Sequence, residues 1–90
     1  MGRREKLKSL HRKLEQSRNN VSFTDLCALA ELVDFTFDRQ GGSHKIYRHK
    51  SHPGIMNFQE VKGKAKPSQI KQLLDFIDQH GLLNEEVPDV

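Results

Sequence analysis

The sequence has a single cysteine, Cys27, and no tryptophan among its 90 residues. A lone cysteine excludes a disulfide within the chain, and such sparse cysteine is typical of a reducing compartment. Cys27 lies in an apolar helical stretch, so we interpret it as a small core residue rather than a nucleophile. We therefore expect a cytoplasmic protein that folds without disulfide bonds.

Long apolar runs are also missing. No stretch approaches the roughly 20 residues that a membrane-spanning helix requires. The opening segment, MGRREKLKSLHRK, is basic and lacks the apolar region of a secretory signal. The sequence thus predicts no membrane contact.

Several catalytic motifs are missing as well. The chain contains no phosphate-binding Walker loop, no dinucleotide-binding glycine fingerprint and no serine-nucleophile elbow. His49 and His52 have an H-x-x-H spacing, but no cysteine ligand and no suitable carboxylate accompanies them, which argues against a zinc site. We expect neither a metal nor a cofactor.

Apolar residues make up only 34% of the chain, yet their spacing predicts a folded domain. Leucines at 7, 10 and 14 have helical spacing, and strand-like alternation begins at Phe35. Ser22 and Pro67 mark helix starts, and Gly81 marks a helix stop. The predicted elements are helices at 4–17, 22–33 and 67–80, strands at 35–39, 44–49 and 55–61, and turns at Gly41-Gly42 and 51–54.

These elements predict an α+β fold of order α–β–β–β–α, preceded by an extra helix. The simplest arrangement is a three-stranded antiparallel sheet with both main helices on one face. Leu82 and Leu83 are expected to fold back on the core. We divide the chain into a basic N-terminal extension (1–20), a domain (21–83) and a disordered acidic tail (84–90). The helix at 4–17 could dock on the domain, dock on a partner, or fray.

Charge is strongly segregated along the chain. Residues 1–20 hold seven Lys and Arg against two Glu, and residues 39–71 hold eight against Glu60 alone. Residues 21–38 contain four acidic and no basic residues. Because the second basic excess coincides with predicted strands and turns, it favours binding of a polyanion such as a phosphate backbone over a merely solvated surface.

The stretch Gly41-Gly42-Ser43-His44-Lys45-Ile46-Tyr47-Arg48-His49 is the most informative one. Glycines allow a phosphate to approach the backbone closely, and histidine is the side chain best suited to move protons near neutral pH. Strand alternation places Lys45, Tyr47 and His49 on one face and His44 on the other. Tyr47 is the natural core residue, so the face with His44 would be exposed to solvent. Ile46 argues against this assignment, because it would place an apolar side chain on the exposed face, and the pattern alone does not settle it.

Cations surround this histidine in the sequence. Arg39, Lys45 and Arg48 could neutralise a bound phosphate, together with the backbone of Gly42 and Ser43. A second basic group, Lys62, Lys64 and Lys66, precedes the helix start at Pro67, where free N–H groups already favour anions. A solvated lysine loop is the alternative interpretation of the second group.

Gly42-Ser43-His44-x-x-Tyr47-x-His49, followed by a strand and then Lys66-Pro67-Ser68-Gln69-Ile70-Lys71-Gln72-Leu73-Leu74, resembles the HicA toxin family. The resemblance covers residues 22–83. It implies a fold similar to the double-stranded-RNA-binding domain, metal-independent messenger-RNA cleavage, His44 as the catalytic residue, and a HicB-type antitoxin partner. The chain departs from the family pattern in three places. It has Asn57-Phe58-Gln59-Glu60 where a Val-Pro-x-His type segment is common, and Ser68 where the family has a glycine after the helix-starting proline. Residues 1–20 are an addition to the family pattern.

The leading hypothesis is therefore an endoribonuclease in which His44 takes the proton from a ribose 2′-OH. Lys45, His49 and water are candidates for protonating the leaving group. The main alternative is a non-catalytic RNA-binding module of the same fold, with affinity carried by the lysines at 62, 64 and 66. A weaker one is an interaction domain whose 4–17 helix docks a partner helix.

Overall fold

The computed structural model describes residues 2–83, so the predicted acidic tail at 84–90 lies outside the described residues. The α+β prediction is confirmed, and the predicted order of elements holds with one addition. The elements are α1 (Arg3–Gln16), α2 (Phe23–Leu32), β1 (Phe35–Gly41), β2 (His44–His49), β3 (Ile55–Val61), β4 (Lys64–Ala65) and α3 (Pro67–Gln79).

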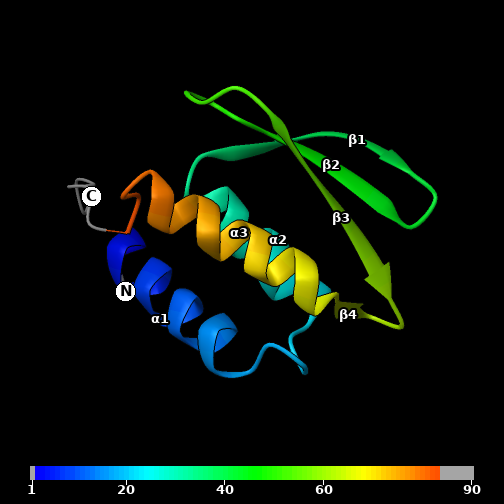
Figure 1. The fold of residues 1–90 in the computed structure, drawn as a ribbon, viewed down its shortest axis with the longest axis horizontal. Helices are drawn as coiled ribbons and strands as arrows, with labels where there is room; N and C mark the ends of the chain where they lie inside the picture. The colour runs from blue at the N-terminus through cyan, green and yellow to red at the C-terminus, as the bar shows by residue number, and fades with distance from the viewer. Residues whose placement is uncertain (1, 84–90) are drawn as a thin grey trace.

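The sheet is antiparallel in the order β1-β2-β3-β4, and α2 and α3 lie against one face of it (Figure 1). The prediction of three strands was wrong by one short strand. Lys62 and Gly63 have φ of +52° and +78°, so they form a tight two-residue turn that folds β4 back on β3. This turn and β4 also hold the start of α2, because the N–H of Phe23 donates to Gly63 O and that of Ala65 donates to Val21 O.

The first hairpin turn lies one residue later than predicted. Gly41 belongs to β1 and pairs with His44, so the turn consists of Gly42 and Ser43. Only Gly42 needs the conformational freedom of glycine, with φ of +61°. His44 remains the first residue of the returning strand.

The predicted start signals of α2 and α3, and the predicted stop of α3, are confirmed by their caps. The Ser22 hydroxyl accepts a hydrogen bond from the N–H of Asp25 at 3.1 Å, and Pro67 occupies the first turn of α3. Gly81 has φ of +61° just beyond α3, and the N–H of Leu82 donates back to Ile77 O at 2.9 Å. Leu82 is therefore buried against the core, as expected.

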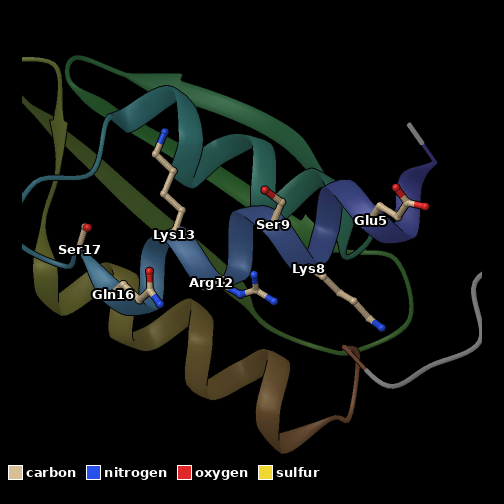
Figure 2. Close-up of a pocket in the computed structure, with 7 residues that line it drawn as sticks. All are labelled: Glu5, Lys8, Ser9, Arg12, Lys13, Gln16 and Ser17. Atoms are coloured by element: carbon tan, nitrogen blue, oxygen red, sulfur yellow. The ribbon is translucent and has the colours of Figure 1, made fainter.

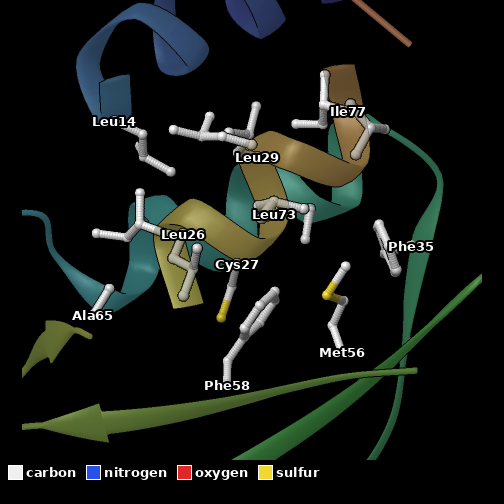
Figure 3. Close-up of a cluster of buried hydrophobic side chains, with 14 of the residues drawn as sticks. Leu14, Leu26, Cys27, Leu29, Phe35, Met56, Phe58, Ala65, Leu73 and Ile77 are labelled. Atoms are coloured by element: carbon white, nitrogen blue, oxygen red, sulfur yellow. The ribbon is translucent and has the colours of Figure 1, made fainter. Parts of the chain in front are cut away.

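One hydrophobic core fills the space between the sheet and the helices (Figure 3). Met56 and Phe58 point from β3 toward Cys27 and Leu73 of the helices, and Phe58 is fully buried. Cys27 is a core residue, as predicted. The opposite face of the sheet has no helix over it (Figure 1), so β-strand residues that alternate with the core positions face outward.

The N-terminal helix is part of this same core. Leu7 and Leu14 of α1 are 2% and 0% exposed, and α1 packs on α2 and α3. Of the three alternatives for this segment, docking on the domain is the one observed. The leucines at 7, 10 and 14 pack on the core of the domain, so only the polar side of residues 4–17 is available to a partner.

Between residues 2 and 83, no helix combines the length and apolar character needed to cross a lipid bilayer.

Candidate functional site

His44 lies on the face of the sheet that the helices leave uncovered. Tyr47 of the same strand is 3% exposed and points into the core, and alternation places His44 on the opposite side. The predicted assignment of Tyr47 to the core and His44 to the open face is confirmed. Ile46 shares the open face and is only partly covered, so the pattern tolerates one apolar residue there.

The imidazole of His44 is held by a neighbouring strand. Its Nδ1 lies 2.9 Å from Oδ1 of Asn57 on β3. β2 and β3 pair Ile46 with Asn57 and His44 with Gln59, so this contact runs diagonally between outward-facing residues. Within the described part of the chain, Nε2 of His44 has no hydrogen-bond partner.

Two arginines share the open face with His44. Arg48 lies four residues after His44 on β2 and therefore on the same face. Arg39 of β1 pairs with Ile46, which also lies on that face. Both side chains are more than half exposed, at 55% and 64%. A β-bulge between Phe37 and Arg39 brings Asp38 to them: Asp38 Oδ2 is 3.0 Å from Arg48 Nε and 3.6 Å from Arg39 Nη1. The shared carboxylate leaves this group one net positive charge.

Lys45 does not join this group. It alternates with His44, so its side chain lies on the helix side of the sheet, with Nζ 5.6 Å from the ring centroid of Phe23. There it borders a shallow pocket between α2 and β2 that Cys27, Glu31 and Tyr47 also line. Lys45 was predicted to bind phosphate together with His44 because the two are adjacent in sequence. Adjacent residues of a strand point to opposite faces, so this prediction was wrong.

The turn residues Gly42 and Ser43 lie beside His44 at the end of the sheet. The carbonyl of Gly42 accepts from Gln40 Nε2 at 3.1 Å, and that of Ser43 accepts from the Glu60 N–H at 3.0 Å. These bonds fix the turn that precedes His44.

The second basic group is at this same end of the sheet. β3 runs from Gln59, the partner of His44, directly into the Lys62 turn. Lys64 Nζ donates to Asn20 Oδ1 at 2.8 Å, and Lys66 is the N-cap of α3 without a side-chain cap bond. The group therefore borders the open face but belongs to a different turn from His44.

His49 has a structural position. Its Nε2 donates to the carbonyl oxygen of Val33 at 2.7 Å, and its Nδ1 accepts from the N–H groups of Ser51 and His52 at 3.0 and 3.2 Å. Its side chain lies on the helix side, with its ring 5.4 Å from that of Phe76. The structure thus separates His49 from His44.

His44 stands apart from any cluster of metal ligands in the described part of the chain. Among residues 2–83 no three His, Cys, Asp or Glu side chains are grouped to hold a metal ion. An open depression along α1 is lined by polar and charged residues that include Lys8, Arg12 and Lys13 (Figure 2). Lys13 is bound there to Asp25 of α2 at 2.7 Å.

Burial perturbs two protonation equilibria on the helix side of the sheet. It raises the pKa of the Cys27 thiol above 9.0, and it raises the pKa of the Tyr47 hydroxyl. Hydrogen bonding to Cys27 and the nearby Glu31 add to the rise at Tyr47. Both groups are therefore uncharged at neutral pH, and neither is suited to act as a nucleophile or base.

Asn57 is the site residue that sequence reasoning missed. In the sequence, the segment Asn57-Phe58-Gln59-Glu60 stands out only as a departure from a family pattern. Its alternation with Met56 and Phe58 was sufficient to place Asn57 on the open face. What the alternation could not give was the register that brings Asn57 beside His44.

No family model, no curated protein and no solved structure matches this chain.

Proposed function

We propose that this protein is a metal-independent endoribonuclease in which His44 is the general base. One observation supports this most: the His44 imidazole lies partly exposed on the open face of the sheet, anchored through Nδ1 while Nε2 is unpartnered among the described residues. An anchored imidazole with one accessible nitrogen is the arrangement that proton transfer requires.

The chemistry uses a nucleophile that RNA itself carries. Nε2 of His44 takes the proton of a ribose 2′-OH, and the 2′-oxygen attacks the adjacent phosphorus. The bond from phosphorus to the 5′-oxygen of the next nucleotide breaks. One product ends in a 2′,3′-cyclic phosphate, and the other begins with a 5′-OH.

The open face limits which groups can assist this step. Arg39 and Arg48 share the face with His44 and would stabilise the charge that develops on the phosphate oxygens. Lys45 and His49 lie on the other side of the sheet, so water is the remaining candidate for protonating the 5′-oxygen. The backbone of Gly42 and Ser43 borders the same position.

The biological role we propose follows from the resemblance to HicA toxins. The α+β arrangement, with a sheet covered on one face by two helices, is compatible with the double-stranded-RNA-binding-domain-like fold of that family. On this proposal the chain is the toxin of a toxin–antitoxin pair, cleaves messenger RNA and is inhibited by a HicB-type antitoxin.

The test compares wild type with His44→Ala, using His11→Ala on α1 as a matched histidine control. Wild type and His11→Ala should arrest growth and degrade messenger RNA on expression, and His44→Ala should do neither. With purified protein, a 2′-deoxy nucleotide at the cleaved position should abolish cleavage. Equal RNA decay with wild type and His44→Ala would reject the role of His44.

A non-catalytic RNA-binding module is the second candidate, because Lys62, Lys64 and Lys66 gather at the turn before α3. It predicts salt-sensitive RNA binding, no cleavage by wild type, and no effect of His44→Ala. Substituting all three lysines by glutamine would then remove most of the affinity. The cleavage assay above decides between the two candidates.

A further inference from the structure

The contact between Asn57 and His44 has a chemical consequence for the ring. An amide Oδ1 can only accept a hydrogen bond, so at 2.9 Å the Nδ1 of His44 carries the proton. In the neutral imidazole the lone pair is then on Nε2, the nitrogen without a partner among the described residues. Asn57 thus selects the tautomer in which the accessible nitrogen is the basic one.

We propose that Asn57 is a positioning residue that fixes the tautomer and the orientation of the His44 ring. This inference rests on the proposed function for its catalytic meaning, but the tautomer itself is a property of the protein alone. Both residues stand on paired strands rather than on loops, so the contact is pre-formed before any RNA binds.

The amide is also suited to its surroundings. Among the described residues, the charged groups on the open face are Arg39, Arg48 and Asp38, with Lys64 at its β4 edge bound to Asn20. Asp38 is already bound by both arginines. A carboxylate at position 57 would orient the ring equally well, but it would add negative charge where a phosphate must bind. A neutral acceptor orients the ring without repelling the substrate.

The first measurement is of the tautomer, in the full chain, by long-range ¹H–¹⁵N NMR correlation at the His44 ring. Wild type should show the Nδ1–H form. Asn57→Ala should shift the ring toward the Nε2–H form. Gln59→Ala, a change on the same strand and face, should leave the Nδ1–H form in place.

The second measurement is the pH profile of RNA cleavage. Asn57→Ala should lower kcat by about 10-fold or more, up to the roughly 10²–10⁴-fold that a positioned general base contributes in total, with KM little changed. Asn57→Asp should restore part of kcat and move the acidic limb of kcat/KM to higher pH, because a carboxylate beside an imidazole favours its protonated form. The carboxylate would move that limb whatever Asn57 does in wild type, so the deciding readouts are those of Asn57→Ala: a merely structural role for Asn57 would leave the Nδ1–H form and kcat unchanged.

The two proposals fail separately. If His44→Ala abolishes cleavage but Asn57→Ala changes neither tautomer nor kcat, positioning by Asn57 is overturned and the ribonuclease stands. If wild type shows the Nδ1–H form and loses it in Asn57→Ala, yet cleaves no RNA, the positioning contact is upheld and the ribonuclease is rejected.

Discussion

His49 donates a hydrogen bond from Nε2 to the carbonyl oxygen of Val33 at 2.7 Å, which ties the end of β2 to the end of α2. Its other nitrogen accepts two backbone N–H groups from the loop that follows. The two histidines of β2 therefore have different tasks, since His44 faces solvent and His49 closes the fold.

We expect His49→Ala to lower the free energy of unfolding by about 2–4 kcal/mol. It removes three hydrogen bonds, each contributing about 1 kcal/mol, together with ring contacts to Phe35 and Phe76. His44→Ala should cost less than about 1 kcal/mol, because that ring is on the open face. Urea unfolding of both variants checks this, and an equal loss in both would contradict the division of tasks.

Arg48 and Lys45 should differ in their effect on RNA binding. The two cations are three residues apart on β2 but lie on opposite faces of the sheet. In a His44→Ala background that prevents cleavage, Arg48→Gln should weaken binding of a single-stranded RNA and lower the salt slope by about 1. Lys45→Gln should change neither quantity. A larger loss with Lys45→Gln would place the RNA on the helix side instead.

Much of this fold could be predicted from periodicity and caps. The helices from Phe23 and Pro67 carry regular apolar stripes with explicit start signals, and β1 to β3 alternate. β4 was missed because two residues, Lys64 and Ala65, are too few to show a period. The turn was placed one residue early because Gly41 and Gly42 are equally permissive, and only strand pairing decides between them.

The site was predictable in part for the same reason. Alternation with Tyr47 as the core residue favoured the open face for His44 but did not settle it, because Ile46 shares that face. The contact with Asn57 depends on the register of β2 against β3, which the loop at 50–54 sets. Nearness in sequence is a poor guide within a strand, as Lys45 demonstrates. Residues two apart share a face, and residues one apart do not.

Leu14 provides a test of whether α1 is integral to the domain. Its side chain is fully buried in the shared core, so Leu14→Ala should cost about 2–5 kcal/mol. Arg12→Ala, on the exposed side of the same helix, should cost less than about 0.5 kcal/mol and serves as the control. If both variants unfold at the wild-type urea concentration, α1 does not contribute to the core in solution.

His80 should titrate below its usual range. Its ring stacks on that of His52 with centroids 4.0 Å apart; partial loss of hydration lowers the pKa of His80, and the charges of His52 and His49 lower it further. The folded state thus binds the proton more weakly than the unfolded chain. The contribution of His80 to stability is fully present above about pH 6.5 and is lost as the pH falls through that value toward the folded-state pKa.

NMR titration of the His80 ring in native buffer and in urea measures this difference directly. The native pKa of His80 should be the lower of the two, and His52→Asn should raise it toward the urea value by removing one charged neighbour. His11→Asn, on α1, should leave the titration of His80 where it is. If the native and urea curves coincide in wild type, or if His52→Asn has no effect, the stacked pair seen between the β2–β3 loop and α3 is not maintained in solution.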